Sequence, residues 1–111
     1  MTCRVNIMPR AEHDAQQIFD WIGERSRDGA TRWWTALMLA VFKLAENPSS
    51  YGFAPENELA DDELRQFLFK TRHGRTYRGV FILVGDEIKV LRIRGPGQPP
   101  LKPDDFKGIP V

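Results

Sequence analysis

The fold is decided by residues 64–94, which read LRQFLFKTRHGRTYRGVFILVGDEIKVLRIR. Three runs in this stretch are rich in aromatic and β-branched residues and alternate in polarity, as strands do; they are residues 65–70, 77–84 and 87–94. The runs are separated by His73-Gly74 and Gly85-Asp86, which favour tight turns. Short turns predict that the three strands form an antiparallel meander.

The residues before this stretch follow a helical period instead. Ala11, Ala15, Ile18 and Ile22 recur at the spacing that places side chains on one face of a helix. A second apolar stripe follows, with Ser26 and Asp28 as candidate caps before it and Asn47-Pro48 as a stop after it, and its members are Ala30, Trp33, Trp34, Leu37, Val41 and Leu44. The pattern predicts an antiparallel pair of helices, roughly Pro9–Arg25 and Gly29–Glu46.

The predicted fold class is therefore α+β, in the order strand, helix, helix and a three-strand antiparallel meander. Residues 3–7 supply the first strand, and the helix pair is expected to cover the apolar face of the meander. With 111 residues, the chain is expected to form one domain over residues 1–111. Its tail, residues 95–111, is rich in proline and glycine, so we expect little regular structure there. The tail either crosses the sheet surface or is available to bind a partner.

The composition is that of an ordinary soluble protein, since 41% of the residues are hydrophobic and 28% are charged. No apolar run approaches the roughly 20 residues that a membrane span needs. The N-terminal residues lack the basic-then-apolar pattern of an export signal. A single cysteine excludes an internal disulfide and suits a reducing compartment. We expect a cytoplasmic protein that makes no contact with membranes.

Charge is distributed very unevenly along the chain, although the net charge is only +1. Residues 64–94 hold eight of the 16 basic residues and only two acids. These bases are Arg65, Lys70, Arg72, Arg75, Arg78, Lys89, Arg92 and Arg94. Arginines on neighbouring strands come close enough to share one phosphate, so the stretch predicts a surface for phosphates or acidic proteins.

Two other interpretations of the charges stay open. Residues 47–63 contain five acids and no base, and these acids can occupy the basic strands within the molecule. Charged residues also protect the edge of a sheet from aggregation.

The histidines and tryptophans give weaker signals. His13 is expected on the polar side of the first helix, whereas His73 lies beside Arg72 and is a weak candidate for proton transfer near a phosphate. Neither histidine has partners at metal-ligand spacing, so we expect no metal and no cofactor. Trp33 and Trp34 are about 100° apart on a helix. One should be buried, and the other is either exposed or an anchor for a partner.

Several short motifs follow one another in a fixed order over residues 4–101. They are A-x3-A-x2-IF-x-WI from Ala11, A-x-RW from Ala30, NP from Asn47, YG from Tyr51, ELR from Glu63, YRGVF from Tyr77, and GD from Gly85 followed by VLRIR from Val90. In order and spacing, this series resembles the RelE/ParE toxin superfamily. The resemblance implies the toxin of a bacterial type II toxin–antitoxin module of the plasmid-stabilisation kind. Such a toxin inhibits growth and is neutralised by a cognate antitoxin that wraps around it.

Members of this superfamily act in two ways. ParE-like toxins bind and poison DNA gyrase, and this is the first function that the resemblance implies here. RelE-like toxins are endoribonucleases that cut mRNA on the ribosome without a metal, which is the alternative. A third interpretation is a non-toxic relative that persists as a binding module.

The resemblance also implies roles for single residues. In RNA cleavage, the 2′-OH attacks the adjacent phosphate, so the protein must move two protons and stabilise the developing charge. Arg78 matches the arginine of the family's YR-x-V-aromatic strand and is the first choice for charge stabilisation. Tyr77 and His73 would move protons if the chain is a nuclease. The expected contacts to a target are Arg65, Lys70, Arg72, Arg75, Arg92 and Arg94.

The chain departs from the nuclease pattern at two places. The lysines of RelE itself fall on Gln66 and Leu68, and the histidine or tyrosine of nuclease members is replaced by Gly95-Pro96-Gly97. Unless His73 or Tyr77 substitutes, the acid–base pair is incomplete. These departures favour the target-binding branch.

Overall fold

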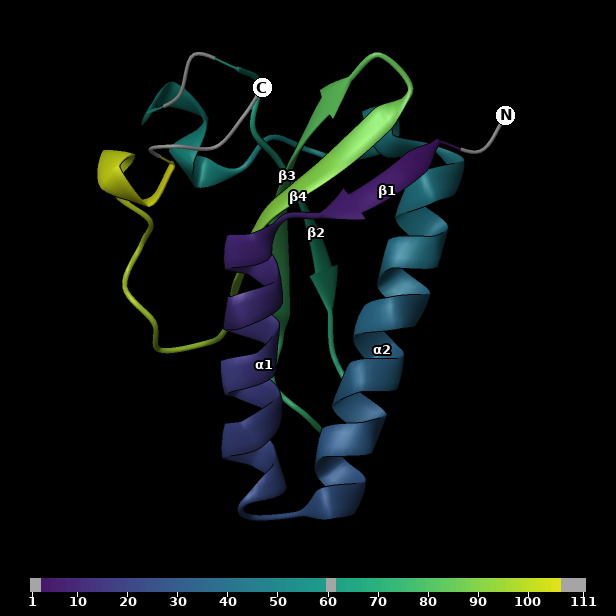
Figure 1. The fold of residues 1–111 in the computed structure, drawn as a ribbon, viewed down its shortest axis with the longest axis vertical. Helices are drawn as coiled ribbons and strands as arrows, with labels where there is room; N and C mark the ends of the chain where they lie inside the picture. The colour runs from purple at the N-terminus through teal and green to yellow at the C-terminus, as the bar shows by residue number, and fades with distance from the viewer. Residues whose placement is uncertain (1–2, 60–61, 107–111) are drawn as a thin grey trace.

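The computed structural model describes residues 3–59 and 62–106. Its main elements are β1 (Arg4–Ile7), α1 (Pro9–Gly23), α2 (Arg27–Glu46), β2 (Arg65–Phe69), β3 (Tyr77–Val84) and β4 (Glu87–Arg94). Three short 3-10 turns are added, namely η1 (Pro48–Ser50), η2 (Pro55–Leu59) and η3 (Pro103–Phe106). The predicted order of strand, two helices and three strands is confirmed (Figure 1).

The helices begin and end where local chemistry dictates. Pro9 occupies the first position of α1, where its missing N–H leaves no hydrogen bond unmade. Ser26 caps α2, because its Oγ accepts a hydrogen bond of 2.9 Å from the backbone N–H of Gly29. Helix α2 ends at Glu46, before Asn47-Pro48, as predicted. Within the part of the chain that the structure describes, no helix is both long and apolar enough to cross a membrane.

The four strands form one sheet in the order β1–β4–β3–β2. The meander β2–β3–β4 is antiparallel, and β1 pairs parallel to β4. Gly85 adopts a φ of +62° in the β3–β4 turn, a conformation that other residues rarely tolerate. Gly79 lies opposite Phe67 on β2, and a Cβ at Gly79 would come within 2.2 Å of that ring. A bare glycine therefore lets the aromatic ring pack across the strand.

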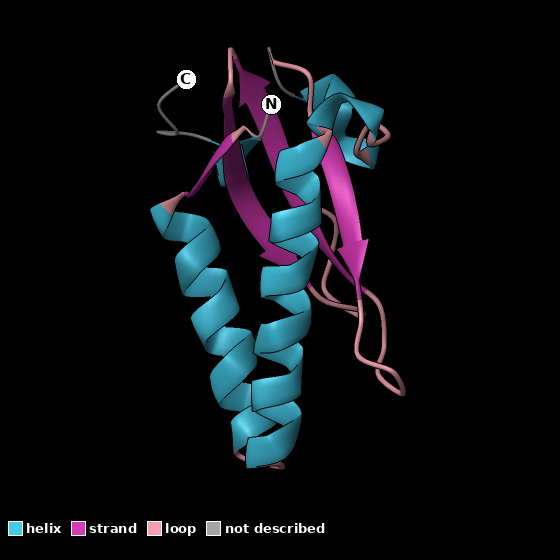
Figure 2. Ribbon diagram, turned by 90° about the vertical axis from the view of Figure 1, so that its right-hand side faces the viewer, coloured by secondary structure: helices cyan, strands magenta, loops and turns pink. Residues whose placement is uncertain are grey.

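One face of the sheet is covered by the helix pair, as Figure 2 shows. Trp33 and Leu37 of α2 pack there among phenylalanines of β2 and β3. Burying each large side chain contributes about 1.5–3 kcal/mol. Trp33 is 2% exposed and Trp34 is 40% exposed, so the prediction of one buried and one exposed tryptophan is confirmed.

The opposite face of the sheet is closed by other parts of the same chain. Val80 and Ile82 of β3 form a second apolar cluster with Leu64 and with Leu101 of the tail. Leu101 is only 2% exposed, so the tail crosses the sheet, which is one of the two alternatives that the sequence left open. The expectation of little regular structure in the tail is corrected at η3, where four residues form a 3-10 turn. Residues 107–111 lie outside the described part of the chain.

Candidate functional site: a closed arginine cluster and an open basic loop

Three of the predicted arginines meet on the sheet face opposite the helices. Arg78 on β3 pairs across the strands with Arg94 on β4, and Arg92 lies beside Val80 on the same face. Burial lowers the pKa of Arg94, and the positive charges of Arg92 and Arg78 lower it further. We call Arg78, Arg92 and Arg94 the closed arginine cluster, because each of them is engaged inside the molecule.

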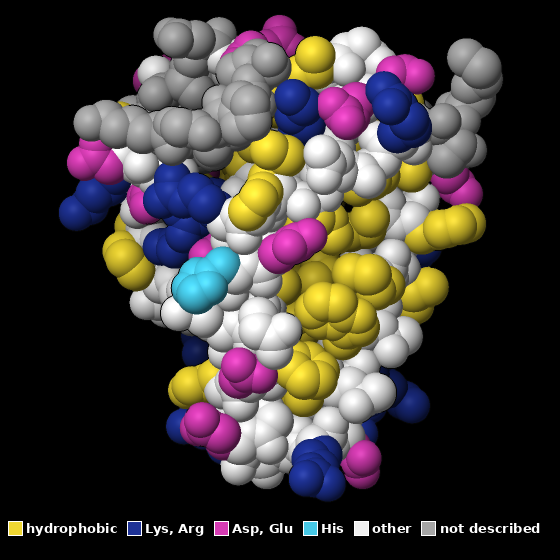
Figure 3. Space-filling view, viewed as in Figure 1, with side chains coloured by type: hydrophobic (Ala, Val, Ile, Leu, Met, Phe, Trp, Pro, Cys, Tyr) yellow, Lys and Arg dark blue, Asp and Glu magenta, His cyan; other side chains and the backbone are white. Residues whose placement is uncertain are grey.

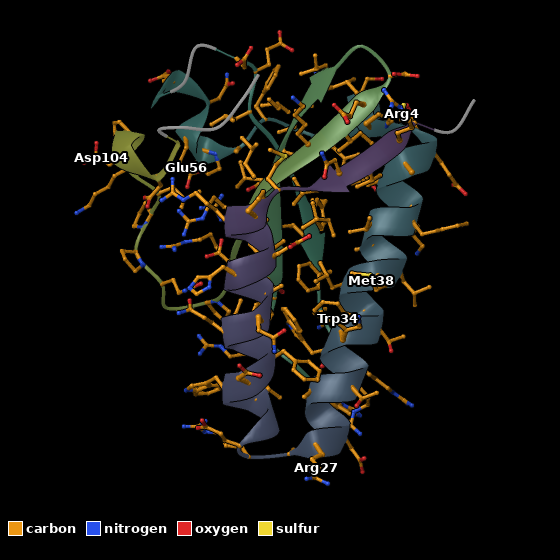
Figure 4. All side chains as sticks on the ribbon, in the orientation of Figure 1. Arg4, Arg27, Trp34, Met38, Glu56 and Asp104 are labelled. Carbon is orange, nitrogen blue, oxygen red and sulfur yellow. The ribbon has the colours of Figure 1, made fainter. Side chains whose placement is uncertain are left out.

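Arg78 is bound by Glu56 of η2. Arg78 Nη1 donates to Glu56 Oε1 at 2.9 Å, and Nη2 donates to Oε2. The backbone N–H of Leu101 adds a third hydrogen bond to Oε2, at 3.2 Å. Burial by itself would raise the pKa of Glu56. The hydrogen bonds that Glu56 accepts, above all the one from Arg78, outweigh the effect of burial and lower the pKa. The Glu56 side chain is buried, with 3% of its surface exposed. Figure 4 shows Glu56 near the segment of the tail that carries Asp104.

Arg92 is held by two carboxylates that lie far from it in the sequence. Its Nε and Nη2 donate to the two oxygens of Asp14 on α1, at 2.7 and 3.0 Å. Its Nη1 donates to Asp105 of η3 at 3.1 Å. The hydrogen bond to Asp14 is the main cause that raises the pKa of Arg92. Arg94 donates from Nη2 to the carbonyl of Pro99, and its buried Nε has no partner among the described residues.

These contacts correct the expectation of an open basic surface on the strands. The interpretation that acids of residues 47–63 occupy the basic strands is right for Glu56. It also holds for Glu63, whose carboxylate lies 3.6 Å from Arg65 Nη2. Asp14 was not predicted as a partner of Arg92, because it lies on the first helix, far in sequence from the basic strands. A signal was available, since Asp14 falls among the apolar positions of α1 and is itself buried.

Three of the predicted cations stay open, and they lie between β2 and β3. Lys70, Arg72 and Arg75 are exposed there, and within residues 3–59 and 62–106 none of them forms an ion pair or a side-chain hydrogen bond. His73 is exposed in the same segment, and His13 is exposed on α1. We call residues 70–76 the open basic loop. Its charge is available to a ligand, whereas Arg78 and Arg92 are paired with carboxylates and Arg94 donates to a backbone carbonyl.

The residues proposed for RNA cleavage are not brought to one place. Tyr77 and Arg78 are neighbours on a strand and therefore point to opposite faces. Tyr77 packs on the helix side, with its ring 5.5 Å from that of Trp33, whereas Arg78 binds Glu56 on the other side. Burial raises the pKa of the Tyr77 hydroxyl, and the charge of Arg75 opposes this. No cluster of potential metal ligands occurs in the described residues.

A second candidate surface is the groove between the two helices. A cavity of about 280 Å³ lies there, with the sheet at its base and Glu12 and Gln16 at its polar side. Its apolar helix residues are Ala15 of α1 and Trp34, Leu37, Met38 and Val41 of α2. We call these five residues the helix groove. Figure 3 shows hydrophobic side chains gathered between the helices, and Figure 4 places Trp34 and Met38 there. An apolar groove with a half-exposed tryptophan fits the predicted anchor for a partner.

Comparison with known proteins identifies the fold. The sequence matches no protein-family model and no curated protein. A chain of the chromosomal ParDE toxin–antitoxin system from P. aeruginosa has a similar structure, with a TM-score of 0.65 at 17% identity over 85% of this chain and 96% of that one. A chain of the RelBE2 toxin–antitoxin complex from Mycobacterium tuberculosis aligns with a TM-score of 0.52 at 18% identity, over 86% and 99% of the two chains. The chain therefore shares its fold with chains of these two toxin–antitoxin complexes.

Proposed function

We propose that the chain is the toxin of a type II toxin–antitoxin module and that it acts by binding its target, with DNA gyrase as the target class. The observation that carries the proposal is the engagement of Arg78 by the buried carboxylate of Glu56. The shared fold with chains of the ParDE and RelBE2 complexes supports the toxin assignment.

The closed arginine cluster argues against efficient RNA cleavage. A phosphoryl transition state needs cations that are already aimed at the developing charge. Arg78 would first have to leave Glu56, and separating a buried ion pair costs about 3–5 kcal/mol. Tyr77 would still point to the other face of the sheet. A toxin that works by binding needs none of these groups to be rearranged.

The helix groove is the surface that best fits an antitoxin. The basic sheet face was the other candidate, but Leu101 and Glu56 of the chain itself already cover it. We propose that an apolar segment of the antitoxin lies along Trp34 and Met38. Together with flanking contacts, such an interface would bury about 2,000 Å² or more in total.

A ribosome-dependent endoribonuclease is the second candidate, and the open basic loop is the observation that favours it. Lys70, Arg72 and Arg75 are exposed cations that can contact RNA phosphates. Cleavage would then rely on Tyr77, Arg75 and His73 instead of Arg78.

The test is induction of the chain in bacterial cells that lack an antitoxin. Growth arrest with a DNA-damage response and intact messages supports the target-binding toxin. Growth arrest with messages cut within codons supports the nuclease. Normal growth at high expression of folded protein overturns both and favours the non-toxic binding module.

A further inference from the structure

A cavity at one end of the sheet is lined in part by Arg75 and Tyr77, which the second candidate function would also use. It has a volume of about 340 Å³ and lies between α1 and the segments where β3 begins and β4 ends. Gln17 and Trp21 of α1 line one side, Arg75 and Tyr77 line another, and Gln98 of the tail completes the wall. We call this space the end cavity. Its volume is within the range of small-ligand sites.

Two aromatic side chains, Trp21 and Tyr77, form part of its wall. Trp21 is 56% exposed, which is unusual for so large an apolar side chain. The guanidinium of Arg25 lies 3.8 Å from the centre of the Trp21 ring, and Arg25 Nη1 donates to the Trp21 carbonyl at 2.7 Å. Arg25 is outside the cavity wall, so it orients the indole without filling the space. The Tyr77 ring is fixed by contacts with Trp33 and Phe69.

The polar groups of the wall are available to a ligand. Across the described residues, the side chains of Gln17 and Arg75 make no hydrogen bond or ion pair. Burial raises the pKa of Tyr77, so its hydroxyl remains a donor at neutral pH. The Gln98 side-chain carbonyl accepts from the backbone N–H of Gly95, which leaves the Gln98 amide NH₂ free to donate.

The net charge around the end cavity favours an anion. Asp14 contributes to the wall, but both of its oxygens are already bound by Arg92 and one also by the backbone N–H of Ile93. Arg75 therefore supplies the unpaired charge. Lys70 and Arg72 of the open basic loop extend that positive charge away from the cavity.

From this combination we propose that the end cavity binds a nucleotide. The base stacks on Trp21, the amides of Gln17 and Gln98 contact its edge, and Arg75 binds its phosphate. A flat aromatic wall, two amides and one cation match a base and its phosphate better than they match an apolar peptide. The nucleotide is either a free nucleoside monophosphate or one residue of a single strand, whose next phosphates would reach the open basic loop.

The test is an NMR titration of the chain labelled with ¹⁵N, in which comparison with the Trp21→Phe variant assigns the Trp21 indole signal. The probes are AMP, UMP, adenosine, inorganic phosphate, single-stranded RNA and DNA oligonucleotides, and an apolar peptide. We expect nucleotides to shift the Trp21 indole signal and adenosine or phosphate alone to do so more weakly. Binding by the monophosphates identifies a free ligand, and binding by oligonucleotides alone identifies a strand.

Two variants and two controls make the test specific. Trp21→Ala should weaken nucleotide binding about fivefold or more, and Arg75→Ala should reduce nucleotide affinity to that of the nucleoside. Phe42→Ala and Arg4→Ala remove an exposed ring and an exposed cation that lie outside the cavity wall, and they should leave binding unchanged. Thermal unfolding confirms that each variant is folded. The inference is overturned if no nucleotide shifts the Trp21 signal, if only the peptide does, or if folded Trp21→Ala and Arg75→Ala bind as the unaltered chain does.

Discussion

The carboxylate of Glu56 binds the guanidinium of Arg78 and, through the backbone N–H of Leu101, also fixes the tail on the sheet. These three residues come from η2, from β3 and from the C-terminal tail. One buried carboxylate therefore joins three segments that are distant in sequence. The same contact pairs, in a half-buried position, the arginine that the family resemblance marks first.

Replacing Glu56 should destabilise the fold strongly. In Glu56→Ala, Arg78 loses its only carboxylate partner among the described residues and the Leu101 N–H loses its acceptor. We expect the free energy of unfolding in urea to fall by about 3 kcal/mol. Glu58→Ala is the matched control, because Glu58 is exposed in the same turn, and it should change stability by less than about 0.5 kcal/mol. Equal losses in both variants would contradict a specific role for Glu56.

The lowered pKa values of Glu56 and Asp105 predict a loss of stability in acid. Both groups ionise more readily in the folded chain than at their ordinary values of 4.5 and 3.8. Their contribution is therefore complete above those ordinary values and is lost as the pH falls through the lower folded values. Urea unfolding measured from neutral pH downward should show a decline that begins near pH 4.5. In Glu56→Gln the decline should be shallower, and an identical decline would show that Glu56 is not its source.

The Asp14–Arg92 pair should behave as a buried ion pair. Asp14→Ala leaves Arg92 with Asp105 alone, and we expect a loss of about 3–5 kcal/mol in unfolding free energy. Replacing both partners by apolar residues, as in Asp14→Leu with Arg92→Met, should recover part of that loss, because no buried arginine is left without Asp14 and Asp105 keeps its ion pair with Arg10. Asp20→Ala on the exposed side of α1 is the control. A double variant that is no more stable than Asp14→Ala would contradict this.

Much of the fold followed from the sequence because the signals were local. Period-two alternation located β3 and β4 at their observed bounds, and the Ser26 cap and Asn47-Pro48 located α2 to within two residues. The parallel pairing of β1 with β4 was not predicted. Parallel strands are not joined by a short turn, so no local sequence signal shows which strands are neighbours.

The site was harder to predict than the fold, because its geometry depends on contacts between distant segments. Alternation correctly placed Arg78 and Arg94 close together. It could not show that Asp14 and Asp105 reach Arg92, as these residues lie 78 and 13 positions away. The roles of the predicted site residues in target binding or cleavage remain predictions.

The helix groove should decide the affinity for an antitoxin. Trp34→Ala removes a half-exposed ring from the groove, and we expect binding to a co-expressed antitoxin to weaken by about 2 kcal/mol or more, roughly thirtyfold. Phe42→Ala is the control, since Phe42 is 70% exposed on α2 but does not line the groove. Calorimetric titration of the refolded chain with the antitoxin measures both affinities. Equal weakening by the two variants would argue for a different contact surface.

The most direct measurement is primer extension on a defined message that is translated by purified ribosomes in the presence of the folded chain. If Glu56 holds Arg78 away from RNA, the message should stay intact at concentrations of the chain that arrest growth in cells. New 5′ ends within codons that appear with the unaltered chain and disappear with a folded Arg78→Lys variant would show the opposite, namely that Arg78 leaves Glu56 and takes part in cleavage.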